Sequence, residues 1–89
     1  MWVLYVVRCA DASLYCGITK NLEQRLYDHN NTKRGAKYTR SRRPVELVIQ
    51  LDFSDRSSVA KAEAKFKKLS TDRKRVFVQS RADLLEYLS

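Results

Sequence analysis

The sequence predicts a small α/β protein of the α+β type, in which a three-stranded, mostly antiparallel sheet is flanked by helices. Three segments, 2–8, 14–19 and 45–53, are apolar or alternate in the manner of strands. Segments between and after them repeat their apolar residues every three to four positions, which is typical of helices. With 89 residues, the chain is expected to form a single domain, 1–89, with a thin core.

The first two strands are expected to form a hairpin. Trp2–Arg8 is apolar on both faces, as a central strand requires, and the polar turn after it is too short for a crossover helix. Leu14–Thr19 should therefore return antiparallel. An odd number of loop residues would place Tyr5 opposite Tyr15 or Gly17, with both rings on one face, whereas an even number would separate them.

A helix should begin after Asn21, whose side chain can accept from first-turn amides while Gln24 reaches back in a capping box. At about 100° per residue, one face of this helix combines two leucines with a cation and an imidazole. Glu23, Gln24, Tyr27 and Asp28 point elsewhere. The residues of the mixed face are Leu22, Arg25, Leu26 and His29.

Arg25 gives the first indication of function. A guanidinium is charged at any working pH and is costly to bury unpaired. Because its helix face holds no acid, an external anion such as phosphate could pair with it. The alternative is a short helix held by its leucines, with Arg25 and His29 extended along its rim.

Basic residues dominate the composition. The chain has 18 Lys and Arg against 10 Asp and Glu, a net charge of +8, which suits a polyanionic partner, above all nucleic acid. No segment pairs a cationic face with a strongly apolar one, so we expect no membrane partner. Segment 30–43, a loop or broken helix, holds six cations and no acid, and Tyr38 there could stack on a base or anchor packing. The expected nucleic-acid-binding residues are Lys33, Arg34, Lys37, Tyr38, Arg40, Arg42 and Arg43.

The third strand, Val45–Phe53, alternates most clearly, apart from Val48. Pro44 suits its first position, where a missing N–H is tolerated. We expect its apolar residues to share one inward face: Val45, Leu47, Ile49, Leu51 and Phe53.

Ser54 or Asp55 should cap a second long helix that reaches about Leu69. Glu63 lies on the flank of its apolar stripe, where it could face a cleft, or it could be an exposed partner of Lys67 four residues later. Shorter helices are expected over 71–78 and after Ser80, with a capping box between Ser80 and Asp83. The last should close the core with Leu84, Leu85 and Leu88.

Two further features bound the class of protein. Cys9 and Cys16 form no disulfide framework and lack metal-ligand spacing, so we expect both to be small buried residues. The apolar start, Trp2–Val7, lacks a basic leader and is too short to span a bilayer. We therefore expect a cytoplasmic protein.

Several motifs together resemble the pattern of the GIY-YIG nucleases in order and spacing. They are LYV at 4–6, YCG at 15–17, an Arg-x-x-x-His on a helix and a later helical Glu. The chain is most similar to small stand-alone bacterial members and to the nuclease domain of the eukaryotic structure-specific resolvase, which share its GA-basic segment, 35–43. It departs from the pattern at the first triplet, which lacks Gly and Ile, at Cys16, and at Ile18, where excision-repair relatives carry a lysine.

The resemblance implies the GIY-YIG fold and a metal-dependent endonuclease that hydrolyses DNA, including branched or damaged DNA, with RNA also open. Glu63 would hold Mg²⁺ or Mn²⁺, and Arg25 would grip the phosphate. Tyr5 would act as general base on water and Tyr15 would bind water or phosphate, or the two would exchange roles. The implied catalytic residues are Tyr5, Tyr15, Arg25, His29, to orient groups or relay a proton, and Glu63, with Gly17 structural.

Two other functions fit the same sequence. A non-catalytic nucleic-acid-binding module would depend on the cations of segment 30–43, with Glu63 incidental. An accessory subunit would need a protein partner and would expose a large apolar patch.

Overall fold

Three strands form one antiparallel sheet in the computed structural model, which describes all residues from Met1 to Ser89. Strand β1 (Trp2–Arg8) lies at the centre, between β2 (Leu14–Thr19) and β3 (Glu46–Phe53). The bounds of β1 and β2 are those predicted, and β3 begins one residue later than expected. Because β1 has neighbours on both edges and helices on both faces, it is buried along most of its length.

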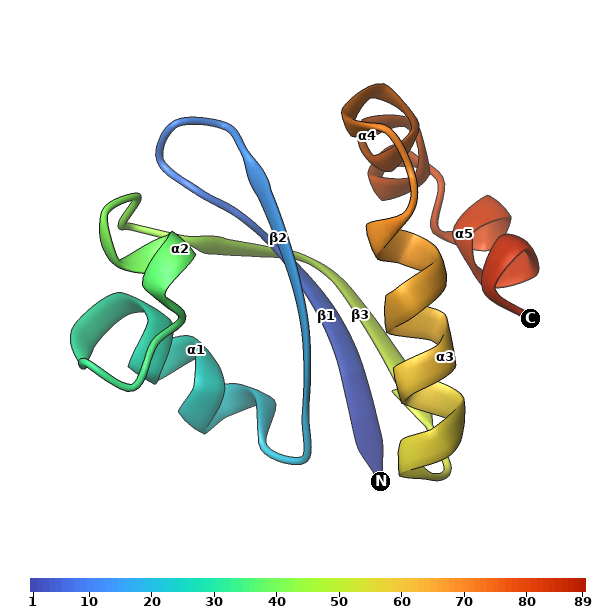
Figure 1. Ribbon diagram of the computed structural model, residues 1–89, viewed down its shortest axis with the longest axis horizontal. Helices are drawn as coiled ribbons and strands as arrows, with labels where there is room; N and C mark the ends of the chain where they lie inside the picture. The colour runs from blue at the N-terminus through green and yellow to red at the C-terminus, as the bar shows by residue number, and fades with distance from the viewer.

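Five helices flank the two faces of the sheet, as Figure 1 shows. One side carries α1 (Leu22–Asn31) and the single turn α2 (Lys37–Arg40). The other side carries α3 (Arg56–Lys67), α4 (Thr71–Gln79) and α5 (Arg81–Leu88). None of the five has the length and hydropathy that a bilayer-spanning segment requires.

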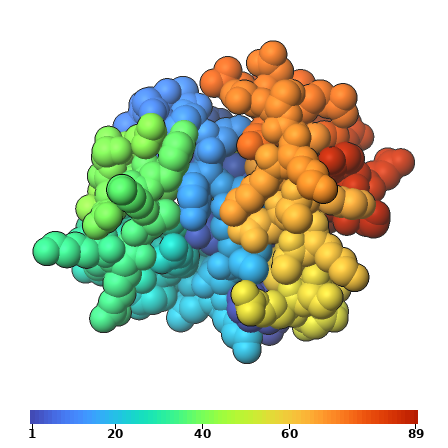
Figure 2. Space-filling model, viewed as in Figure 1, coloured from blue at the N-terminus to red at the C-terminus, as the bar shows by residue number.

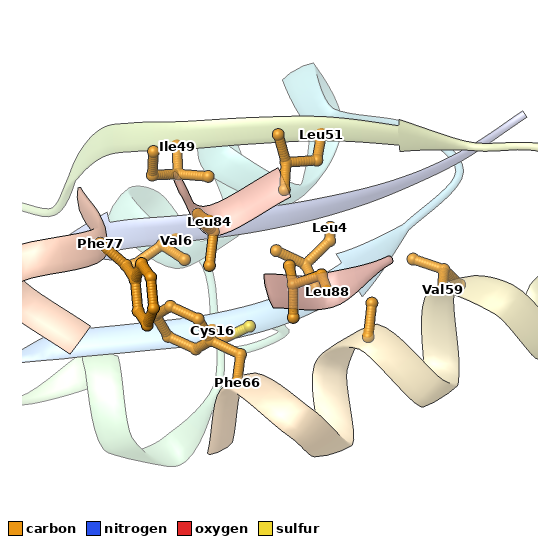
Figure 3. Close-up of a cluster of buried hydrophobic side chains, with 11 residues drawn as sticks. Leu4, Val6, Cys16, Ile49, Leu51, Val59, Phe66, Phe77, Leu84 and Leu88 are labelled. Atoms are coloured by element: carbon orange, nitrogen blue, oxygen red, sulfur yellow. The ribbon is translucent and has the colours of Figure 1, made fainter. Parts of the chain in front are cut away.

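The main hydrophobic core lies between the sheet and helices α3 to α5 (Figure 3). Phe66 of α3 and Phe77 of α4 pack there against strand residues such as Leu4 and Cys16. A smaller cluster lies on the opposite face of the sheet, beneath α1. It consists of Tyr5, Val7, Cys9 and Val45, with Leu22 and Leu26 packed against it. Both cysteines are free and buried, as predicted.

A bulge in β3 corrects the expectation that the apolar residues of Val45–Phe53 share one face. Successive residues of β1 pair with Ile49 and then with Leu47, so Val48 is an extra residue in the ladder. The extra residue reverses the alternation of the strand. Ile49 consequently packs in the main core, whereas Leu47 packs with the cluster beneath α1.

The predicted helix caps form, with one difference. Asn21 Oδ1 accepts from the Gln24 amide at 3.1 Å, and Asp55 Oδ1 accepts from the Ser58 amide at 2.8 Å. The Gln24 side chain does not reach back to complete a capping box, and donates instead to Asp28 Oδ1 at 3.1 Å. That contact accompanies the burial of Asp28, which was expected to point away from the core and is 7% exposed.

The last helix also differs from its prediction. Leu84 and Leu88 are buried in the main core, but Leu85 is exposed. Adjacent residues on a helix point about 100° apart, so the two apolar neighbours cannot both face the sheet. The Ser80 hydroxyl bonds the Asp83 carboxylate at 2.8 Å in place of a backbone amide.

Candidate active site

The hairpin places the two tyrosines on one face of the sheet. Its five-residue loop, 9–13, is the odd-numbered case, and β1 pairs Tyr5 with Gly17 and Val7 with Tyr15. A Cβ atom at Gly17 would lie 2.4 Å from the Tyr5 Oη atom. Gly17 therefore leaves the space that the Tyr5 hydroxyl occupies.

The Tyr5 hydroxyl is the meeting point of a buried hydrogen-bond network. It lies 2.7 Å from His29 Nε2, and Arg25 Nε donates to it at 3.3 Å. On the other side of the imidazole, His29 Nδ1 lies 2.8 Å from the Thr39 hydroxyl, which itself donates to the Ala36 carbonyl at 2.9 Å. Three predicted site residues thus meet here, joined to a fourth residue on α2.

This network assigns the tautomer of His29. Because the Thr39 proton goes to the Ala36 carbonyl, His29 Nδ1 donates to Thr39, and Nε2 accepts from Tyr5. The opposite tautomer would leave the Tyr5 proton without an acceptor inside the protein, which buried hydroxyl groups avoid. His29 is therefore arranged as a proton acceptor for Tyr5.

Burial keeps both partners neutral at neutral pH. Burial, with a smaller contribution from Arg25, lowers the pKa of His29 to about 4. Burial raises the pKa of Tyr5 to about 12, against the lowering effect of Arg25. Tyr5 is 1% exposed, whereas Tyr15 is only half-buried and packs edge-on against the His29 ring at 5.3 Å. Tyr15 is therefore the tyrosine that a substrate can reach.

Arg25 has no acidic partner. Besides Tyr5, its guanidinium donates only to the Arg34 carbonyl, at 2.6 Å. The two ion pairs of the protein are Arg42 with Asp11 and Lys67 with Glu63, and neither involves this residue. Arg25 is half-buried beside the network and its charge is uncompensated, so it is suited to an incoming anion.

Glu63 lies on the other side of the sheet. Its carboxylate pairs with Lys67 Nζ at 3.1 Å, and its side chain is 22% exposed. Partial burial opposes the charged form of Lys67, but the hydrogen bond and charge of Glu63 raise the pKa of Lys67 above its usual value. Burial, helped by the charge of Glu63, raises the pKa of the Cys16 thiol to about 12. Of the two predicted environments, the pairing with Lys67 forms, although Glu63 is half-buried rather than exposed, and Glu63 lines no groove.

The tyrosine network and Glu63 are therefore not in direct contact. Tyr15 and Gly17 point to the α1 side of β2, and Cys16, near Glu63, points to the α3 side. The strand that carries Tyr15 and Cys16, β2, is an edge strand, so the two sides of the sheet meet around its open edge. No group of three or more His, Cys, Asp or Glu residues is placed to hold a metal ion.

A groove of about 360 Å³ runs along this edge. In Figure 2 it is the hollow between the green segment of α2 and the orange segment of α3 and α4, with blue β2 at its base. Tyr38 lines the groove on the α2 side, and Tyr15 lies at its base on β2. The opposite side is lined by Lys67, Lys74 and Arg75. Tyr15 thus belongs both to the groove and to the contacts around His29.

The basic segment 30–43 divides into two groups in the structure. Lys33, Arg34, Lys37 and Arg40 are exposed and form no ion pair. The remaining members have partners within the protein, which favours the packing alternative for Tyr38. Tyr38 stacks on Tyr15 and lies under Arg42, Arg42 pairs with Asp11 at 2.9 Å, and Arg43 donates to the carbonyls of Asp28, His29 and Thr32.

The sequence gives no sign of Thr39 or of the α4 cations in this region. Thr39 belongs to a single helical turn, which is too short for a periodic pattern to mark its buried position. Lys74 and Arg75 lie far along the chain from Tyr15. Only the packing of α4 beside β2 brings them to the groove.

Comparison with known proteins agrees with this fold and arrangement. The model of the GIY-YIG catalytic domain matches residues 1–75. A UPF0213 protein of Desulfotalea psychrophila is 49% identical over 79 residues, which are 89% of this chain and 72% of that protein. A UPF0213 protein of Lactiplantibacillus plantarum is 49% identical over 90 residues, covering 99% and 78%.

A solved structure extends the likeness to three dimensions. The solution NMR structure of a UPF0213 protein from Bacillus halodurans has a TM-score of 0.60 and 31% sequence identity, covering 100% of this chain and 95% of that one. The predicted α+β fold is thereby confirmed. Because the domain model spans most of the sequence and includes every residue of the tyrosine network, this chain belongs to the GIY-YIG family, which is a nuclease family.

Proposed function

We propose that this protein is a metal-dependent endonuclease that hydrolyses phosphodiester bonds of DNA. The observation that carries the proposal is the uncompensated Arg25 guanidinium, held by the Tyr5 hydroxyl beside the accessible Tyr15. Phosphodiester hydrolysis needs positive charge on the phosphate, an activated water and a stabilised leaving group. Arg25 supplies the first of these.

Tyr15 is the group that acts on the attacking water. The buried hydroxyl of Tyr5 has both His29 and Arg25 as partners, so it orients Arg25 from within the protein. This assignment exchanges the roles first expected for the two tyrosines. A cation, Lys67, lines the same groove as Tyr15.

Glu63 would hold the metal ion. Mg²⁺ is bound in many sites by one or two carboxylates together with waters and substrate phosphates, so one half-buried carboxylate suits it, and Mn²⁺ accepts the same donors. When bound, the ion supplies Lewis-acid stabilisation of the developing charge. Glu63 would then exchange its ion pair with Lys67 for the ion, which leaves the Lys67 ammonium free for phosphate.

The net charge of +8 and the exposed cations of segment 30–43 support a polyanionic substrate. We propose DNA, including branched or damaged DNA. The strand that is cut passes between Arg25 and the edge of β2, where the half-buried Tyr15 lines the groove.

Cleavage of labelled single-stranded, duplex, flapped and four-way DNA tests the proposal, with Mg²⁺ or Mn²⁺ and with EDTA. Glu63→Gln and Arg25→Gln are each expected to lower kcat at least about 100-fold, the usual effect of removing one transition-state contact. Glu86→Gln, which removes an exposed carboxylate from α5, is the matched control and should cleave like the wild type.

Cleavage that persists in EDTA, or in Glu63→Gln, would exclude the metal-dependent mechanism. DNA binding with no cleavage of any of the four substrates would reject the enzyme and support a non-catalytic nucleic-acid-binding module.

A further inference from the structure

The wall of the groove formed by α3 and α4 carries two cations, Lys74 and Arg75, that the proposed reaction does not use. Lys67, Lys74 and Arg75 line it, together with Thr71. Lys67 and Lys74 are close enough to β2 for their charges to act on the Cys16 thiol. These cations therefore gather at the open edge of the strand that carries Tyr15.

No acid balances the two cations of α4. Neither Lys74 nor Arg75 has a carboxylate within ion-pair distance. Lys74 is half-buried, and its ammonium group lies over the Phe66 ring, 5.9 Å from the centroid. Packing thus holds a cation in the groove beside others of the same sign. A concave surface lined by one sign of charge concentrates the field and favours an anionic ligand.

The position of this wall indicates which anion it would bind. Tyr15 lines the same groove and contacts His29, so the groove begins at the site where the reacting phosphate would lie. A nucleic-acid strand carries phosphates at regular intervals on both sides of the bond that is cut. A strand bound at Arg25 and running along β2 would bring a neighbouring phosphate against α4.

We propose that Lys74 and Arg75, assisted by Lys67, bind a backbone phosphate of the substrate strand that flanks the scissile phosphate. This inference rests on the proposed function and adds a second contact surface to it. The exposed cations of segment 30–43 lie on the α2 side of the groove and the new site lies on the α4 side. The strand would thus be held from both sides along the edge of β2.

The test compares two double variants that remove the same charge and keep the aliphatic part of the side chain. Lys74→Gln/Arg75→Gln changes the groove. Lys61→Gln/Lys68→Gln changes two exposed lysines that do not line it, one in α3 and one at its C-terminal cap. Binding of a fluorescent single-stranded DNA oligonucleotide is measured by anisotropy in EDTA over a range of salt concentrations. Thermal unfolding confirms that each variant is folded.

The groove variant is expected to weaken binding at least about 10-fold and to reduce the slope of log K against log salt by about 0.7, the value for one lost phosphate contact on a single strand. With Mg²⁺, its KM should rise while kcat is kept. Equal affinities and salt slopes for the two double variants would overturn the inference. Because binding is measured without metal, this result is separate from a failure of the wild type to cleave, which would reject only the proposed function.

Discussion

At the residue scale, the site consists of buried neutral groups that hydrogen-bond the charged guanidinium of Arg25. Thr39, His29 and Tyr5 form a chain of hydrogen bonds, and Arg25 donates to its end. No member of the chain is charged at neutral pH, so burial costs it little as long as every donor and acceptor is paired. No buried side-chain nitrogen or oxygen of the protein lacks a partner.

Replacing Thr39 by Val should therefore remove the hydrogen bond of His29 Nδ1–H while the side chain at position 39 keeps nearly the same volume. The variant leaves His29 Nδ1–H without its acceptor, and we expect a loss of about 1–3 kcal/mol in the free energy of unfolding. His29 is the only histidine of the chain, so the ¹⁵N chemical shifts of its ring report the tautomer directly. The wild type should show Nδ1–H at neutral pH, and Thr39→Val a mixture of the two tautomers.

Thr39→Ser keeps the hydroxyl and is the control, which should retain the Nδ1–H tautomer. A wild-type imidazole protonated at Nε2 would contradict the assigned network.

At the element scale, Arg43 joins the end of α1 to the start of β3. Its guanidinium donates to the carbonyls of Asp28, His29 and Thr32 at the C-terminal end of α1, where helix carbonyls run out of intrahelical amide partners, although that of Asp28 also accepts from the Thr32 amide. Asn30 adds a second connection, since its side chain bonds both the amide and the carbonyl of Val45. These contacts fix α1, and with it the two functional side chains of that helix, against the sheet.

Arg43→Ala should thus destabilise the protein by about 2 kcal/mol, because buried carbonyls lose a charged donor. Arg40→Ala removes the same charge from an exposed position and should change the free energy of unfolding by less than about 0.5 kcal/mol. Urea unfolding measures both values. Equal stabilities of the two variants would show that Arg43 is not needed to hold α1.

At the scale of the whole molecule, the stability of the protein depends on keeping His29 neutral. The usual pKa of histidine, 6.5, applies to the unfolded chain, and that of folded His29 is about 4. As pH falls from 6.5 to 4, the unfolded chain binds a proton that the folded protein does not, so the folded state is progressively disfavoured. The lowered pKa values of Asp11 and Asp55 act in the same direction but only below about their usual 3.8.

We therefore expect the free energy of unfolding to fall by about 3 kcal/mol between pH 7 and pH 4, because the pKa values of His29 in the unfolded and the folded chain both lie in this range. Urea unfolding at a series of pH values measures the fall, and His29→Gln should lack it. An NMR titration of the single imidazole in the folded wild type gives the same quantity independently. A titration midpoint near 6.5 would contradict the buried, neutral histidine.

The local features of this protein were predictable because they depend on near neighbours in the chain. The bounds of β1 and β2 follow from apolar runs and a short turn, and the cap at Asn21 from its own side chain. The motifs LYV at 4–6 and YCG at 15–17, with Arg25, His29 and Glu63, also sufficed to indicate the family, because their order and spacing resemble a known pattern.

Only the tertiary structure decided the features that depend on distant parts of the chain. Because of the bulge at Val48, Leu47 lies on the side of the sheet that carries Tyr5. The alternation of apolar and polar residues does not specify where a strand contains an extra, bulged residue. The burial of Tyr5 and the approach of Lys74 to Tyr15 arise from the packing of helices on both sides of β2. The sequence determined which chemical groups the protein carries, whereas long-range packing decided which of them are buried, paired or open to a substrate.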